Sequence, residues 1–225
     1  MRALPYPLIA AVSDRRRLAS SDGEACELLV AWAAAVARAG IDIIQLREHG
    51  LTDAALTHLV RRVVAATAGM AAAVVVNDRT DVALVTGCAG VHLPSTAPPA
   101  EVVRRITPGD FWIGRSVHDW DEPDTVARGC DYLTFGTVFS SNSKPAGHRV
   151  SGLEALQSAC ERAAVPVLAI GGVTVANAAA IAGTGAAGVA AIGLFTDGWS
   201  PRGGDDHVAT VVEQLREAFA RVGRG

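Results

Sequence analysis

Two short apolar runs in the middle of the chain each end in groups that can do chemistry. The first, Ile113 to His118, ends on a serine and an imidazole. The second, Asp131 to Phe139, contains a glycine and leads into a hydroxyl-rich loop that reaches Lys144. Ligands of parallel α/β folds bind at the carboxyl ends of the strands. The two runs therefore predict a site at one edge of a parallel sheet.

His118 is the candidate acid or base. It follows Ser116 beyond the end of the first run, at the rim where such groups are placed. An imidazole titrates near neutral pH and can both accept and donate a proton. The alternative is a surface histidine that begins a helix, because Asp119 and Asp121 follow it. Its position favours the catalytic role.

Long polar side chains share one face of an expected strand near residue 43. Side chains alternate along a strand, so Ile43, Gln45 and Arg47 point to the same side. Because a barrel strand is covered on both faces, Gln45 and Arg47 must reach the barrel mouth or find partners inside. Anion binding by Arg47 is favoured, and a structural ion pair with Glu48 or another acid is the alternative.

Two other expected strand ends carry polar side chains with two interpretations each. Asn77 and Asp78 follow the run from Ala71 to Val76, and they could hold a hard cation or cap the next helix. His92 lies in Gly90-Val-His-Leu-Pro94, where it could contact a ligand or be a hydrogen-bonded barrel histidine. It has no metal-binding partner at the i+4 position.

Two strands that run into glycines predict a phosphate site. The run from Val165 to Ile170 meets Gly171 and Gly172, and the run from Gly188 to Ile192 meets Gly193. Glycine lets backbone N–H groups approach an anion, and barrels often bind phosphate between their seventh and eighth loops. Tight packing of short turns also requires glycine, but two such turns favour phosphate.

A hydroxyl-rich loop follows the sixth expected strand. Ser141 and Ser143 offer hydroxyl donors, and Lys144 offers a cation on a segment that also contains Pro145 and Gly147. A loop that is merely soluble has a similar composition. We expect these three side chains to bind substrate.

The spacing of the apolar runs predicts a single (β/α)8 TIM barrel over residues 1–225. Eight β-type runs begin near residues 8, 41, 71, 89, 111, 131, 166 and 187, with alanine-rich helical segments between most of them. Such barrels take roughly 200 to 250 residues. The expected helix boundaries are a cap at Thr52 with an end near Thr67, a start at Pro98 and Pro99, a capping box at Ser151 and Glu154, and stops at Gly40, Gly183 and Gly223.

Composition excludes several classes of protein. The formal charge of −3 comes from interspersed acids and bases, which does not fit a partner such as nucleic acid or anionic lipid. Four separated cysteines without a C-x-x-C pair argue against a zinc site and a disulfide framework, and they indicate a cytoplasmic protein with reduced thiols. The longest uncharged apolar run, Leu28 to Ala37, is too short for a membrane span.

Together, these motifs resemble the thiamine phosphate synthase superfamily over nearly the whole chain. The similar segments are Gln45 to Glu48, Val76 to Arg79, Gly90 to Leu93, Ile113 to His118, Asp131-Tyr132 with Gly136, Ser141 to Pro145, and Ala169 to Val173. The resemblance implies a TIM barrel with two possible activities. The synthases join a pyrimidine pyrophosphate to a thiazole phosphate with Mg²⁺, and the TenI-type tautomerases aromatise the thiazole phosphate carboxylate before that coupling.

The chain combines features of both branches. The synthase pattern has lysine where this chain has His49, and an acidic metal ligand shortly after Gly-Val-His, where this chain has Leu93 to Pro98. The tautomerase branch resembles this chain in a leucine-proline-serine turn and in Gly114 to His118. Asn77, Asp78 and the serine-rich loop are similar to the synthases.

The main hypothesis is a thiazole tautomerase that needs no cofactor. His118 would move the proton, Gly172 and Gly193 would bind the phosphate through their N–H groups, and Gln45 or Arg47 would hold the carboxylate. The second hypothesis is a Mg²⁺-dependent synthase, with Asp78 at the metal, Arg47, Asn77 and Lys144 at the pyrophosphate, and Ser141 and Ser143 at the thiazole phosphate. The third is a non-catalytic protein that binds thiazole phosphate or thiamine phosphate and has a regulatory or scavenging role. A homodimer is possible.

Overall fold

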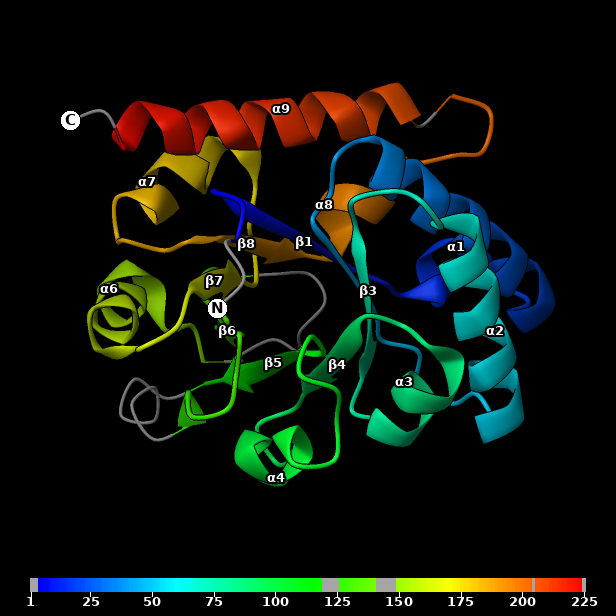
Figure 1. Ribbon diagram of the computed structural model, residues 1–225. Coiled ribbons are helices and arrows are strands. Elements are labelled where there is room, and N and C mark those ends of the chain that lie inside the picture. Colours follow the sequence, from blue (N-terminus) through cyan, green and yellow to red (C-terminus); the bar gives the residue numbers. More distant parts are fainter. Residues whose placement is uncertain (1–3, 119–125, 141–148, 204, 224–225) are drawn as a thin grey trace.

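Eight parallel strands form one closed barrel in the part of the chain that the structure describes. The structure is a computed structural model, and it describes residues 4–118, 126–140, 149–203 and 205–223. The strands follow one another around the barrel in chain order (Figure 1). They are β1 (Leu8–Val12), β2 (Ile43–Leu46), β3 (Ala73–Asn77), β4 (Gly90–Leu93), β5 (Trp112–Val117), β6 (Tyr132–Phe135), β7 (Val167–Ile170) and β8 (Gly188–Ala191). This confirms the TIM barrel that the strand spacing predicts.

Helices cover the outside of the barrel. They are α1 (Asp22–Arg38), α2 (Asp53–Ala66), α3 (Thr80–Thr86), α4 (Ala100–Arg104), α6 (Gly152–Arg162), α7 (Ala178–Ala182), α8 (Gly193–Thr196) and α9 (Asp205–Val222), with the short 3₁₀ helices η1 (Arg15–Arg17) and η2 (Val175–Asn177). The long α9 lies beside α7 and α1, at the top of Figure 1. It covers the side of the barrel where the first and last strands meet.

The inside of the barrel is filled by side chains, and this fixes which residues reach its mouth. The interior cluster comprises Leu8, Ala10, Val12, Ile43, Val75, Trp112, Tyr132, Leu168 and Ala190. Ile43 lies in this cluster, whereas Ile44 and Leu46 pack outward against the helices. The strand alternation predicted for β2 is therefore confirmed. Gln45 and Arg47 continue the inward face towards the carboxyl end of the barrel.

Helix boundaries agree with the sequence in most places. The Thr52 hydroxyl caps α2 by accepting from the N–H of Ala55 at 3.3 Å. Pro99 precedes α4, and Gly40 follows α1 with a left-handed φ of 89°. The capping box expected at Ser151 is wrong. Ser151 has a right-handed helical backbone and no capping hydrogen bond from its side chain, and its N–H instead donates to the carbonyl of Thr137.

A buried ion pair anchors the turn after β2. Glu48 Oε2 lies 3.1 Å from Nη1 of Arg15, and the two side chains are 1% and 2% exposed. Ser13 Oγ also donates to Glu48, at 2.5 Å. The alternative pairing of Arg47 with Glu48 is therefore wrong, because the Glu48 carboxylate turns away from the barrel mouth to Arg15.

We expect Glu48→Gln to destabilise the fold by ~1–3 kcal/mol, because the Arg15 guanidinium loses its buried charged partner and keeps only the exposed Asp22 carboxylate, at 2.9 Å. Urea unfolding of the variant and the wild type measures the difference. The control is Glu27→Gln, which removes an ion pair with Arg62 from the surface and should change stability little. If Glu48→Gln and Glu27→Gln lose the same free energy of unfolding, the buried ion pair stabilises the fold no more than the surface pair does.

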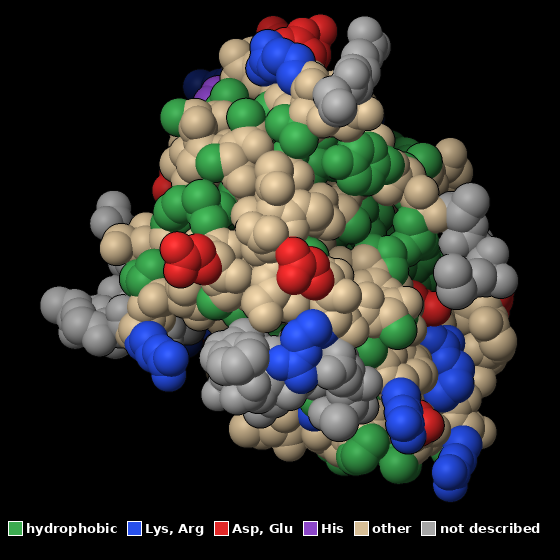
Figure 2. All heavy atoms as spheres, turned by 90° about the vertical axis from the view of Figure 1, so that its left-hand side faces the viewer, with side chains coloured by type: hydrophobic (Ala, Val, Ile, Leu, Met, Phe, Trp, Pro, Cys, Tyr) green, Lys and Arg blue, Asp and Glu red, His purple; other side chains and the backbone are tan. Residues whose placement is uncertain are grey.

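The described surface carries charged side chains of both signs and several exposed apolar side chains. No helix in the described ranges is long and apolar enough to cross a membrane. On the face shown in Figure 2, most of the basic side chains lie in the lower half, and acidic side chains lie above and between them. Exposed apolar side chains include Val85 on α3, Val102 on α4 and Ile106. They are a place where a homodimer contact could form, and the homodimer stays a prediction.

Candidate active site

A cavity of about 950 Å³ opens at the carboxyl ends of the strands. It brings together eleven of the residues that the sequence predicts for the site. They are Gln45, Arg47, Asn77, Asp78, His92, Ser116, His118, Gly171, Gly172, Ile192 and Gly193. Ser141, Ser143 and Lys144 lie outside the described residues, although their neighbour Ser140 lines the cavity.

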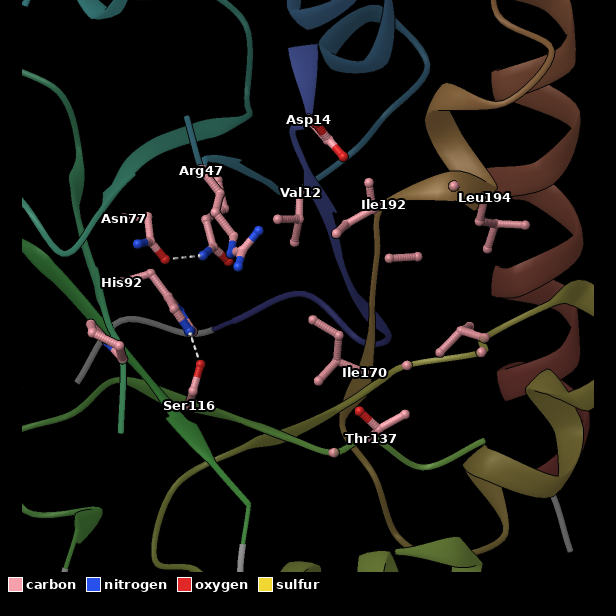
Figure 3. A pocket seen from close by; sticks show the side chains of 18 of the residues that line it. Val12, Asp14, Arg47, Asn77, His92, Ser116, Thr137, Ile170, Ile192 and Leu194 are labelled. Carbon is pink, nitrogen blue, oxygen red and sulfur yellow. Dashed lines mark hydrogen bonds between the residues drawn. The ribbon is translucent and has the colours of Figure 1, made fainter. Parts of the chain in front are cut away.

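The cavity has a polar wall and an apolar wall. Figure 3 shows Arg47, Asn77, His92 and Ser116 along one side, and these side chains come from β2 to β5 or directly follow them. Val12, Ile170 and Ile192 lie on the other side, with Leu194 beyond them. Such a pairing suits a small heterocycle that carries charged groups, because the ring needs apolar contact and the charges need donors.

Arg47 is a cation available to a ligand in the cavity. Its side chain is exposed, and among the described residues it has no ion-pair partner. Its backbone N–H is held by Ser13 Oγ at 2.9 Å. Beside it, Gln45 Nε2 donates to Asn77 Oδ1 at 2.9 Å. This contact fixes the two amides in one orientation, so the polar wall is largely preformed.

His49, at the same end of the cavity, is held towards the neutral form. Burial lowers the pKa of His49, and the nearby charges of Arg47 and Arg16 lower it further. It occupies the position at which the synthase pattern has lysine. The mouth of the cavity therefore carries a mainly neutral imidazole there.

His92 is a hydrogen-bonded barrel histidine that also forms part of the cavity wall. Its Nε2 lies 2.9 Å from Ser116 Oγ, and its Nδ1 lies 3.1 Å from the Tyr132 hydroxyl. Burial lowers the pKa of His92 to about 3, and the charge of Arg47 acts in the same direction. The hydrogen-bonded interpretation of this residue is therefore confirmed, and its contact with a ligand stays a prediction. The ring is neutral at physiological pH.

This shift predicts a loss of stability in acid. An unfolded histidine titrates near pH 6.5 and folded His92 near pH 3, so the unfolded chain binds the extra proton between these values. The folding stability that neutral His92 provides is complete above pH 6.5 and falls as the pH drops towards 3. Urea unfolding measures the free energy of unfolding at each pH. Between pH 7 and pH 4, we expect this free energy to fall by on the order of a few kcal/mol more in the wild type than in His92→Asn. Parallel pH curves would contradict this.

His118 stands at the rim with one nitrogen fixed. Its Nδ1 lies 2.6 Å from the carbonyl oxygen of Gly136, and its side chain is exposed to the cavity. A carbonyl oxygen only accepts, so Nδ1 carries the proton in this contact. The lone pair of a neutral ring is then on Nε2. The arrangement orients the imidazole as a base.

Unpaired backbone N–H groups lie at the apolar side of the cavity. Within the described ranges, the N–H groups of Gly172 and Gly193 have no hydrogen-bond acceptor. Gly172 has a left-handed φ of 63°, and a Cβ there would come within 2.5 Å of the carbonyl oxygen of Ser140. Glycine is therefore required at this position by both backbone conformation and packing.

Arg17 and Asp197 are cavity residues that sequence reasoning missed. Their side chains form an ion pair of 2.7 Å between η1 and the end of α8, next to Gly193. Local sequence carries no signal for this contact, because the two residues are 180 positions apart. The pair places both groups beside Gly193, where a Cβ would lie 2.7 Å from the Asp197 carboxylate and 3.4 Å from the Arg17 guanidinium.

The described donor set does not fit a Mg²⁺ ion held by the protein. Asp78 lines the cavity, but no cluster of three histidine, cysteine or acidic groups that could hold a metal occurs in the described part of the chain. Between Pro94 and Pro98, where the synthase pattern has an acid, Arg115 binds three backbone carbonyls. Nor does Asp78 cap α3, since Arg79 stands at the cap position without a side-chain hydrogen bond. The other described carboxylates that line the cavity, Asp14 and Asp197, are paired with Arg17. The single remaining carboxylate, Asp78, would hold Mg²⁺ weakly.

Comparison with known proteins identifies the family. A family model described as thiamine monophosphate synthase (TMP-TENI) matches residues 18–195. The chain belongs to this family. It is therefore a TIM-barrel enzyme of thiamine biosynthesis from the thiamine monophosphate synthase family.

Relatives of this thiamine monophosphate synthase family member cover most of its length. A putative thiamine-phosphate synthase 2 of Aquifex aeolicus is 31% identical over 86% of this chain and 100% of its own length. A thiamine-phosphate synthase of Roseiflexus castenholzii is 35% identical over 84% and 82%. Among solved structures, thiamine phosphate pyrophosphorylase from Pyrococcus furiosus is similar, with a TM-score of 0.76, 29% identity and 96% coverage of both chains.

Proposed function

We propose that this enzyme is a thiazole tautomerase that aromatises a thiazole phosphate carboxylate. The observation that carries the proposal is the geometry of His118. Its Nδ1 is held by the Gly136 carbonyl at 2.6 Å, which leaves Nε2 as a base at the rim of the cavity. The reaction only relocates a proton between a ring carbon and the exocyclic carbon. One imidazole that accepts and then returns the proton satisfies this balance.

The walls of the cavity suit the parts of this substrate. The phosphate is expected to accept hydrogen bonds from the N–H groups of Gly172 and Gly193, with the backbone of Gly171 and Ile192 beside them. The thiazole ring would pack on Ile170. These contacts would leave the carboxylate on the polar wall, within reach of Arg47 or Gln45.

Thiamine-phosphate synthase is the second candidate, and the comparisons support it more directly than the first. The family model and the relatives described above carry the synthase name. A cavity of about 950 Å³ also has room for more than one small substrate. Arg47, Asn77 and Asp78 would then face a pyrophosphate. Against this candidate stands the donor set at Asp78, because the other described carboxylates of the cavity, Asp14 and Asp197, are paired with Arg17.

One pair of assays separates the two candidates. Purified protein is given thiazole phosphate carboxylate alone, and separately the pyrimidine pyrophosphate with thiazole phosphate, each with and without Mg²⁺. The tautomerase predicts aromatisation that is independent of Mg²⁺ and unaffected by Asp78→Ala. Coupling that requires Mg²⁺ and is lost in Asp78→Ala would establish the synthase instead. Ligand-induced stabilisation without either turnover would indicate a non-catalytic binder.

A further inference from the structure

A chain of buried hydrogen bonds lies beneath the polar wall of the cavity. It runs from the Tyr132 hydroxyl to His92 Nδ1 at 3.1 Å, and from His92 Nε2 to Ser116 Oγ at 2.9 Å. Tyr132 and His92 are each 1% exposed, whereas Ser116 is half-buried and lines the cavity. Figure 3 shows the contact between His92 and Ser116 at the cavity wall.

The packing around this chain of bonds keeps it in place. A Cβ on Gly114 would lie 2.2 Å from Tyr132 Cζ and 2.6 Å from His92 Nδ1. The missing side chain at Gly114 therefore provides the space in which the two rings meet. The rings lie with their centroids 5.6 Å apart.

The direction of the hydrogen bonds follows from the available acceptors. The buried Tyr132 hydroxyl has one hydrogen-bond partner among the described residues, His92 Nδ1, and a buried hydroxyl proton without an acceptor is costly. Tyr132 must therefore donate to Nδ1. A neutral imidazole has one N–H, so in His92 it is on Nε2, and this group donates to Ser116 Oγ.

Ser116 is then left with a proton to donate into the cavity. Its oxygen accepts from His92, and Thr134 Oγ1 also donates to it at 3.4 Å. The Thr134 hydroxyl also lies 3.4 Å from His92 Nε2, and apart from this hydroxyl no hydrogen-bond acceptor for the Ser116 proton lies in the described part of the chain. The cavity beside it also contains the guanidinium of Arg47, on the same wall in Figure 3. A hydroxyl donor beside a cation matches an anionic oxygen.

We propose that Tyr132 is a positioning residue that fixes Ser116 as a hydrogen-bond donor to the carboxylate of the substrate. The inference rests on the proposed function for the identity of the ligand, since the phosphate is assigned to the opposite side of the cavity. The hydrogen-bond direction itself does not depend on the reaction. Tyr132 acts through His92, and Ser116 makes the contact.

The first test is the tautomer of His92 in the wild-type protein. Nitrogen-15 NMR of the histidine side chains distinguishes Nε2–H from Nδ1–H. In the wild type, we expect the proton of His92 on Nε2 and a hydrogen bond to Nδ1. In Tyr132→Phe this hydrogen bond is lost, so the Nδ1 signal should move towards the value of a nitrogen without a hydrogen bond. The matched control is Tyr6→Phe, which changes the only other tyrosine, an exposed one. A wild-type His92 protonated on Nδ1 would overturn the proposal.

The second test measures affinity rather than turnover. Ser116→Ala is expected to weaken binding of the thiazole phosphate carboxylate roughly 10- to 100-fold, as for a lost hydrogen bond to a charged group. Thiazole phosphate without the carboxylate should bind the variant and the wild type alike. Tyr132→Phe should also weaken binding of the carboxylated ligand alone, but by a smaller factor. Without the Tyr132 hydroxyl, His92 can adopt either tautomer, and Ser116 remains a donor in one of them. Equal losses for both ligands would overturn the carboxylate assignment.

These measurements separate the inference from the proposed function. If Tyr132→Phe does not fold, two measurements still test the inference. They are the tautomer of His92 in the wild type and the affinity of Ser116→Ala for the two ligands. Selective loss of the carboxylated ligand in a protein that does not aromatise it would support the role of Ser116 and reject the tautomerase.

Discussion

Replacing His118 with alanine is expected to lower kcat for aromatisation by roughly 10²- to 10⁴-fold, the usual contribution of a positioned acid or base. KM should change little, because the groups assigned to bind the phosphate and the carboxylate are other residues and all of them remain in the variant. The Gly136 carbonyl that orients the ring remains in the variant. Steady-state kinetics with thiazole phosphate carboxylate measure both constants.

The control for this prediction is His58→Ala, which changes an exposed histidine on α2, outside the cavity. It should retain the wild-type rate. An active His118→Ala variant would remove the acid–base assignment. A variant that loses affinity without losing kcat would make His118 a binding residue.

Replacing Gly172 with valine is expected to reduce affinity for the phosphorylated thiazole roughly 10²-fold or more. The left-handed φ of 63° is unfavourable for any L side chain, and the Cβ would meet Phe139 and Ser140 within 2.7 Å. The backbone N–H must then turn, and a charge-assisted hydrogen bond to phosphate is lost. Calorimetric titration with thiazole phosphate and with the unphosphorylated thiazole alcohol measures the effect.

Selectivity for the phosphate is the critical result. The alcohol should bind Gly172→Val about as well as the wild type, since the ring contacts lie at Ile170 and the polar wall. Gly23→Ala in the first turn of α1 is the control, because a Cβ there meets nothing within 4 Å. If both ligands lose affinity equally, the effect is a general disturbance of the cavity and the phosphate assignment fails.

The fold was predictable because it depends on local patterns. Each strand begins within two residues of its expected start, since apolar runs and the punctuation around them mark strands in any context. Alternation along β2 also predicted which side chains enter the mouth, and Gln45 and Arg47 line it. The gathering of His118 with Gly172 and Gly193 then follows from the barrel, because all three follow strand ends.

Contacts between distant segments could not be predicted. Glu48 pairs with Arg15 and not with its neighbour Arg47. Arg15 lies in the turn after β1, and this turn comes close to Glu48 only in the folded barrel. The pair of Arg17 and Asp197 arises in the same way, between loops at opposite ends of the chain. At Ser151, the local capping signal is overridden by backbone hydrogen bonds to the segment after β6.

In the proposed enzyme, the imidazole after the fifth strand and the amides after the seventh and eighth strands act on one ligand. A crystal structure with bound thiazole phosphate carboxylate would show whether they do. We expect His118 Nε2 within about 3.5 Å of the carbon that exchanges the proton, with the phosphate on the N–H groups of Gly172 and Gly193. A ligand bound with its phosphate at Arg47 and Asp78, and its ring out of reach of His118, would contradict it.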